Sequence, residues 1–286
     1  MGKVQVVTDS SAYLKVGTVR HLGVTVVPLT ISFGEEELRH GIDITTNVFS
    51  QRFKYGSSSP IISPPSVGSL RGVYTKLSKT TDAILSIHAS SELSSFCQAA
   101  ASAAAPLLGR CRIEVVDSLA TSLGLGILVT TAAKTAEQGR SLDEIVHLVR
   151  GMIPHMYGAF VTESLVYLEK DRLIDKTQAV LGTMLDIKPF LVIEDGKIMP
   201  MEKVQTREEA LDKLFNFVAE FSHIEQIAVV QSASYTTKEA ETLIGQLKTI
   251  LPDMDFPVIL CDPILASHIG PDAMGVIVYE GVDRWG

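Results

Sequence analysis

The sequence predicts an α/β protein built from two domains, and three observations support this fold class. The chain has 286 residues, which is long for one core and sufficient for two domains. Its first half alternates apolar strands with helices, the cadence of a parallel sheet. Its second half contains an Asp195-Gly196 turn between two strands, which is typical of a hairpin. We therefore expect a parallel-sheet α/β domain over residues 1–155 and a mixed-sheet α+β domain over residues 156–286.

In the first domain, short apolar runs that end at polar residues predict the strands. They cover residues 3–8, 24–33, 83–88 and 112–116. Helices are expected over residues 13–22, 67–77, 97–108, 126–136 and 142–152. Ser66 stands where an N-cap is needed, and Ser141 begins a capping box that Glu144 completes. The charged residues 35–37 are interpreted as a solvated turn.

In the second domain, hairpin and crossover patterns are mixed, so its sheet should be partly antiparallel. Strands are expected over residues 160–162, 189–194, 197–204, 227–231, 258–261 and 275–279. Helices are expected over residues 164–167 and 176–184, after Thr206 and from Thr236. The segment 267–271 is predicted to be a loop between the last two strands.

Composition excludes several functional classes. The net charge of -8, with no run of Lys or Arg, disfavours nucleic acid and anionic membrane surfaces as partners. The three cysteines lack a CxxC spacing and no His/Cys cluster occurs, so neither a disulfide framework nor a metal site is expected. No signal-peptide core and no run of ~20 apolar residues is found, which predicts a soluble cytoplasmic protein.

Hydroxyl side chains gather where strands pass into helices. In a parallel sheet these corners share one edge, and ligands of open α/β folds bind there. Ser94 and Ser95 precede a helix, where hydroxyls and backbone N–H groups together can hold a carboxylate or a phosphate. The alternative is that each serine only caps its own helix. The corner serines are Ser10, Ser11, Ser63, Ser66, Ser90, Ser91, Ser94, Ser95 and Ser118.

Other polar residues are candidates with an equally simple structural interpretation. His268 follows an apolar run and precedes Gly-Pro, so it is expected on a turn, where it can donate a hydrogen bond to an anion. Arg172 can bind an anion through two N–H groups or pair with Asp171 or Glu169. Asp9 and Asp117 each end a strand, where an aspartate orients a hydroxyl or caps a helix.

Together these features resemble the DegV family, which includes the fatty-acid-binding subunits of bacterial fatty acid kinase. The resemblance covers nearly the whole chain, and the order of its motifs makes it specific. The motifs are Thr8–Ala12, Val27–Leu29, Gly41–Ile44, Ser63–Ser66, Ile87–Gln98, Val116–Ser118, Leu165–Arg172, Ile187–Pro189 and His268–Pro271.

The resemblance implies two α/β domains with a ligand cleft between them that encloses one long-chain fatty acid. It implies that Ser63, Ser94 and Ser95 surround the carboxylate, with His268 and Arg172 contributed by the second domain. A separate catalytic kinase subunit is the implied partner and phosphorylates the carboxylate. The implied ligand is the fatty acid itself, with no cofactor and no catalytic residue in this chain, and transient membrane contact is allowed.

The chain departs from the family pattern beside the implied headgroup site. Ile62 replaces a hydroxyl residue of the family motif Thr-Ser-Gln-Pro-Ser, and Pro64 offers no N–H. Phe96 stands where the family Ser-Gly-Thr has a small polar residue. Loss of one neutral hydrogen bond costs about 1 kcal/mol. Ile62 and Phe96 are therefore expected to line the cavity and to alter its acyl preference.

Two alternatives to a lipid carrier remain open at this point. One is a hydrolase of small esters that uses Ser94, His268 and either Asp9 or Asp117 as a triad, although the chain lacks a GxSxG motif. The other is a degenerate relative with no lipid ligand, which Ile62 and Phe96 make credible. An ester assay and an analysis of co-purified lipid separate these hypotheses.

Overall fold

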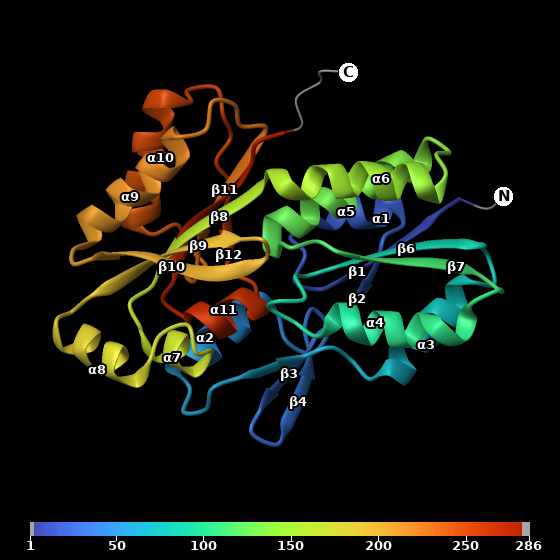
Figure 1. Ribbon diagram of the computed structural model, residues 1–286, viewed down its shortest axis with the longest axis horizontal. Coiled ribbons are helices and arrows are strands. Elements are labelled where there is room, and N and C mark those ends of the chain that lie inside the picture. Colours follow the sequence, from blue (N-terminus) through green and yellow to red (C-terminus); the bar gives the residue numbers. More distant parts are fainter. Residues whose placement is uncertain (1–2, 282–286) are drawn as a thin grey trace. The chain divides into compact units, whose positions relative to one another are not determined.

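The computed structural model describes residues 3–281, which form two compact units (Figure 1). Unit 1 comprises Met1–Thr45 and Pro60–Pro154, and unit 2 comprises Thr46–Ser59 and His155–Gly286. The segment Thr46–Ser59 therefore belongs to unit 2, although both of its neighbours along the chain belong to unit 1. The sequence pattern did not indicate this excursion.

Unit 1 is built on a four-stranded parallel sheet, as the sequence predicts. The strand order is β2 (Thr25–Val27), β1 (Gln5–Asp9), β6 (Ala83–His88) and β7 (Arg112–Asp117). One face of the sheet is covered by α1 (Val16–Leu22), α5 (Ser122–Glu137) and α6 (Leu142–Met152), and the other by α3 (Val67–Leu77) and α4 (Phe96–Ala104) (Figure 1). Short 3-10 turns follow α4 at Ala105–Leu107 and α6 at Ile153–His155.

A small antiparallel sheet in unit 1 corrects two sequence predictions. It has the order β4 (Glu36–Arg39), β3 (Thr30–Phe33) and β5 (Ile61–Ser63). The predicted single strand 24–33 is two strands, because Pro28 interrupts it and the N–H of Leu29 bonds to the Ser10 hydroxyl. Of the predicted turn at 35–37, Glu35 lies in the turn before β4, whereas Glu36 and Glu37 begin β4, where their charges are tolerated on an exposed edge strand.

Unit 2 contains the predicted mixed sheet, in which only β11 and β12 pair in parallel. Its hairpin turns at Asp195 and Gly196, whose φ angles of 48° and 79° are those of a tight two-residue hairpin turn. The order is β10 (Lys197–Val204), β9 (Lys188–Glu194), β8 (Met156–Val161), β13 (Met274–Tyr279), β11 (Gln226–Gln231) and β12 (Val258–Leu260).

Two groups of helices cover the sheet of unit 2. Helices α9 (Arg207–Ala219) and α10 (Lys238–Ile250) enclose an apolar core with one face of the sheet. On the other side lie α2 (Thr46–Tyr55), α7 (Val166–Lys170), α8 (Lys176–Met184) and α11 (Pro263–Ile269) (Figure 1). Within the described part of the chain, no helix is both long and apolar enough to cross a bilayer.

The helix starts follow the sequence pattern closely. Ser66 accepts a hydrogen bond from the N–H of Ser69, and Ser141 forms a complete capping box with Glu144. Thr206 also caps its helix as expected. The cap of α10 is Thr237 and not Thr236, a shift of one residue.

Candidate functional site

The carboxyl ends of the parallel strands in unit 1 meet at one edge, and serines follow three of them. Ser10 and Ser11 follow β1, Ser90 and Ser91 follow β6, and Ser118 follows β7. Hydrogen bonds join these corners, since the N–H of Ala89 after β6 donates to the carboxylate of Asp9 at the end of β1 at 3.0 Å, and the N–H of Ser118 donates to the carbonyl oxygen of His88 at 3.1 Å. The corners therefore form one connected group, which we call the serine corner.

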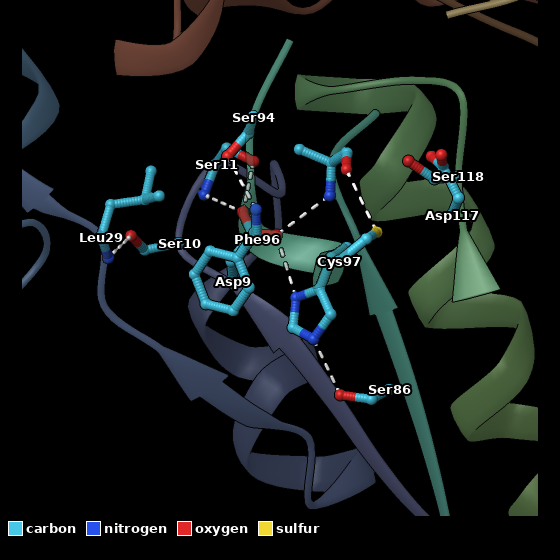
Figure 2. A network of polar contacts seen from close by, with 12 residues as sticks. Asp9, Ser10, Ser11, Leu29, Ser86, Ser94, Phe96, Cys97, Asp117 and Ser118 are labelled. Atoms are coloured by element: carbon cyan, nitrogen blue, oxygen red, sulfur yellow. Dashed lines mark hydrogen bonds and ion pairs between the residues drawn. The ribbon is translucent and has the colours of Figure 1, made fainter. Parts of the chain in front are cut away.

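The carboxylate of Asp9 lies at the centre of the serine corner and accepts hydrogen bonds from two strand ends (Figure 2). Its Oδ1 accepts from the N–H of Ser11 at 3.0 Å and from the hydroxyl of Ser11 at 2.5 Å. Its Oδ2 accepts from the N–H of Ala89 at 3.0 Å and lies 3.1 Å from Nδ1 of His88. Asp9 orients a hydroxyl and does not cap α1, whose N-cap is Lys15.

A buried path of polar groups continues from His88. Its Nε2 lies 2.8 Å from the hydroxyl of Ser86, which lies 2.8 Å from the hydroxyl of Tyr74. Tyr74, Ser86, His88 and Asp9 have no exposed surface. Burial raises the pKa of Asp9. The hydrogen bond and charge of His88, together with the donors of Ser11 and Ala89, outweigh burial and hold the pKa of Asp9 below its usual value.

This arrangement bears on the hydrolase alternative. The serine that contacts the imidazole of the His88–Asp9 pair is Ser86, and it is fully buried. A nucleophile must be reached by its substrate, so Ser86 does not serve as one. The carboxylate of Asp9 is occupied by Ser11, His88 and Ala89. Asp117 accepts from the N–H groups of Ser91 and Leu119.

His40 belongs to the serine corner, although the sequence suggested no role for it. Its Nδ1 lies 2.9 Å from the hydroxyl of Ser10, and 6% of the residue is exposed. Burial lowers the pKa of His40 to about 4, so the ring is neutral at pH 7. Its partner lies thirty residues earlier in the chain, and no local pattern reveals such a pairing.

The loop after β6 carries the predicted headgroup residues Ser94 and Ser95. Ser94 is half-buried, and its hydroxyl accepts from the N–H of Phe96 at 3.3 Å. Ser95 is exposed and is the N-cap residue of α4, but its hydroxyl makes no cap hydrogen bond. The donor capacity of Ser95 is therefore not used by its own helix.

The predicted cavity residues Ile62 and Phe96 differ in burial. Phe96 is fully buried, and its ring stacks on that of His88 with 4.3 Å between the ring centroids. Ile62 is half-buried in β5 and pairs with Ile31. Ser63 is also half-buried in β5 and pairs with Thr30, one residue after Leu29, which bonds to Ser10. Pairing through β3 thus connects the strand of Ser63 to the serine corner.

His268 and Arg172 lie in unit 2, where the structure corrects one prediction. His268 lies in the last turn of α11, not on a loop, because Asp262 caps a helix that begins at Pro263. Its Nδ1 is 2.5 Å from a carboxylate oxygen of Asp171. The next residue, Arg172, is exposed and has a φ of 59°. The structure therefore brings His268 close to the segment that carries Arg172.

A cavity of about 210 Å³ in unit 2 is a separate feature. Its floor is apolar and includes Val161, Leu211 and Met274. The nearby cations are already paired, since Lys188 and Arg207 both contact Glu163. These ion pairs make the cavity a poor site for a carboxylate. Over residues 3–281, no cluster of His, Cys, Asp and Glu is arranged to hold a metal ion.

Comparison with known proteins identifies the family. A model of DegV, described as a family of uncharacterised proteins, matches residues 3–281. This chain belongs to the DegV family. A DegV domain-containing protein of Halalkalibacterium halodurans is 30% identical over 283 residues, which are 98% of this chain and 99% of the relative.

Solved DegV structures share the fold along the whole chain. A fatty acid binding DegV family protein from Streptococcus agalactiae is 27% identical, with a TM-score of 0.85 over 99% of this chain and 100% of its own. DegV from Bacillus subtilis, described as a fatty acid binding protein, is 26% identical, with a TM-score of 0.83 over 98% and 100%. The two-domain DegV-like fold class expected from the sequence is confirmed.

Proposed function

We propose that this DegV-family chain binds a single long-chain fatty acid and is a carrier, not a self-sufficient enzyme. The observation that carries the proposal is the unused hydroxyl of Ser95 beside Ser94 at the start of α4. Hydroxyls and free N–H groups at a helix start favour an anion. The similar fatty-acid-binding DegV proteins support a carboxylate as that anion.

Affinity and orientation come from different parts of such a ligand. Each methylene that leaves water contributes about 0.8 kcal/mol, so the acyl chain supplies most of the affinity. The polar groups then select a carboxylate and fix its direction. We assign this role to Ser94 and Ser95, with Ser63 as a further hydroxyl. Ile62 and Phe96 are proposed to adjust the acyl preference.

His268 and Arg172 are proposed to act on the same carboxylate or on its phosphorylated product. Asp171 supports this role because its carboxylate contacts Nδ1 of His268 and so fixes the orientation of the imidazole ring. Arg172 supports it by being an exposed guanidinium next to Asp171, suited to two hydrogen bonds with an anion.

The proposed partner is a separate fatty acid kinase catalytic subunit. That subunit transfers the γ-phosphoryl group of ATP to the carboxylate, which gives an acyl phosphate and ADP. A cytoplasmic location belongs to the proposal and is supported by the unpaired thiols of Cys97, Cys111 and Cys261. Transient membrane contact is proposed as the route of lipid transfer, which is checked by transfer from lipid vesicles.

Mass spectrometry of the organic extract of the purified protein tests the proposal. We expect about one equivalent of a fatty acid per chain. A blank extract from protein produced in lipid-rich cells, with no binding on addition of oleate, would refute fatty-acid binding and favour the degenerate alternative.

A matched pair of variants tests the headgroup assignment. Ser94→Ala should weaken oleate binding about ten-fold, because one hydrogen bond to a charged group is lost. Ser102→Ala is the control, since its exposed hydroxyl bonds only within α4, to Gln98. Equal affinities of the two variants would remove Ser94 from the site. Hydrolysis of a chromogenic ester that depends on Ser94 would instead support the hydrolase alternative.

The second-unit residues are tested by phosphorylation. Acyl phosphate formed from labelled oleate, ATP and the catalytic subunit is trapped with hydroxylamine and counted. His268→Ala should reduce the trapped product and weaken binding while the circular dichroism spectrum stays unchanged. Unchanged affinity together with unchanged product would exclude His268.

A further inference from the structure

The path Tyr74–Ser86–His88–Asp9 is not used by the proposed function and calls for its own explanation. Tyr74 comes from α3, Ser86 and His88 from β6, and Asp9 from β1. All four residues are fully buried. Asp9 and Ser86 are labelled in Figure 2, and His88 connects them through its two ring nitrogens. Burying four polar groups is costly unless each has a hydrogen-bond partner, and each of these four side chains has at least one.

The contact with the carboxylate of Asp9 determines which ring nitrogen of His88 carries a hydrogen. An ionised carboxylate can only accept hydrogen bonds. Nδ1 of His88 must therefore carry a proton, which it donates to Oδ2 at 3.1 Å. The same oxygen accepts the N–H of Ala89 at 3.0 Å, and Oδ1 accepts the two donors of Ser11. One carboxylate thus joins the end of β1 to the end of β6.

His88 also contacts the far end of the loop that follows β6. Its ring stacks on Phe96, with an angle of 22° between the planes. Phe96 is the first residue of α4, and its N–H donates to the hydroxyl of Ser94 at 3.3 Å. The loop is therefore held at Ala89 through Asp9 and at Phe96 through the imidazole. Between these two points lie Ser90, Ser91, Ser94 and Ser95.

We propose that His88 and Asp9 are positioning residues that hold the Ser90–Ser95 loop in the geometry that binds the carboxylate. Neither residue contacts the ligand. The inference deepens the proposed function and rests on it. Phe96 takes part in this positioning, because its ring packs on His88 and its N–H donates to the hydroxyl of Ser94.

The test compares folded variants by affinity and by a signature of the headgroup. His88→Asn retains a donor toward Asp9 but loses the stack on Phe96, and Phe96→Leu is a milder variant that leaves both His88 and Asp9 in place. Oleate labelled with ¹³C at the carboxyl carbon reports the headgroup environment by its chemical shift. Each variant should bind oleate about ten-fold more weakly and shift the carboxyl resonance, since the loop donors are displaced.

Ile145→Ala is the control for a simple loss of stability. Ile145 is fully buried in α6 and lies outside the path and the loop. Ile145→Ala should lower the melting temperature while the oleate affinity and the carboxyl resonance stay at wild-type values. If His88→Asn and Phe96→Leu behave like Ile145→Ala, the positioning role is wrong.

A second measurement distinguishes this inference from the proposed function. Amide hydrogen exchange of the lipid-free protein reports the loop directly. In His88→Asn, or in Phe96→Leu if the former does not fold, the amides of Ala89 and Ser94 should exchange faster than in Ile145→Ala. Wild-type protein that binds no fatty acid would refute the proposed function, whereas unchanged exchange at these amides would refute the positioning role.

Discussion

Each unit holds a histidine against an aspartate, and the two pairs differ in their access to water. In unit 1 the side chains of His88 and Asp9 are fully buried. In unit 2 those of His268 and Asp171 are 22% and 23% exposed. A buried pair that loses one member leaves an uncompensated group, whereas a hydrated pair contributes little. The same two residue types thus form a water-excluded contact in unit 1 and a partly hydrated contact in unit 2, so the contact in unit 1 is the more costly one to break.

The largest expected effect is a difference in the free energy of unfolding between variants of Asp9 and Asp171. Asp9→Asn should lower the free energy of unfolding by about 3–5 kcal/mol, because the new NH₂ group faces donors and the charge is lost. Asp171→Asn is the matched control and should cost about 1 kcal/mol or less. Urea unfolding followed by circular dichroism measures both. Equal losses of unfolding free energy in the two variants would contradict the difference between the buried and the hydrated pair.

The next effect is a pH dependence that comes from His40 in unit 1. Its pKa is lowered to about 4 by burial, so the unfolded chain binds the proton more tightly than the folded one. The stability that follows is complete above the unfolded pKa of about 6.5. It is lost as the pH falls from about 6.5 to 4, on the order of 3 kcal/mol in total.

His40→Asn should flatten this slope, because the variant has no group that titrates there. Unfolding free energies at pH 7, 6, 5 and 4 check the prediction. Asp9 contributes a separate loss at lower pH, since its lowered pKa keeps its stabilisation until the pH falls below about 4. A wild-type curve that is flat between pH 6.5 and 4 would show that His40 is not buried as a neutral ring.

The smallest effects compare two serines at helix starts in unit 1. Ser141→Ala should cost about 1 kcal/mol, because Ser141 accepts from the N–H of Glu144 and forms a capping box. Ser95→Ala should change stability by less than about 0.5 kcal/mol, because its hydroxyl caps nothing. Thermal unfolding of the lipid-free variants measures both. A large loss for Ser95→Ala would mean that its hydroxyl serves the fold and not a ligand.

The sequence predicted the elements whose signals are local. Ser66, Ser141 and the Asp195-Gly196 turn each depend on neighbours a few residues away, and all three were found as expected. The edge strand β4 was missed because its glutamates resemble a solvated turn. His268 was placed on a loop because Gly-Pro follows it, although these residues only end α11.

The contacts of the serine corner were not predictable in the same way. His88 and Asp9 are separated by 79 positions, and Ser10 and His40 by 30. Only the parallel pairing of β1 with β6 brings the first two together, and no periodicity encodes which side chains meet across it. The family resemblance named Ser94 and Ser63 but gave no role to the residues behind them.

The excursion of Thr46–Ser59 into unit 2 has a consequence for how the chain folds as it is synthesised. Helix α2 leaves the ribosome before any other part of unit 2, yet its partners α7 and α11 come more than a hundred residues later. Phe49 and Phe53 are almost fully buried in the finished protein, where Phe53 contacts Tyr167 edge to face. The packing of α2 is therefore completed only after α7 and α11 have been synthesised.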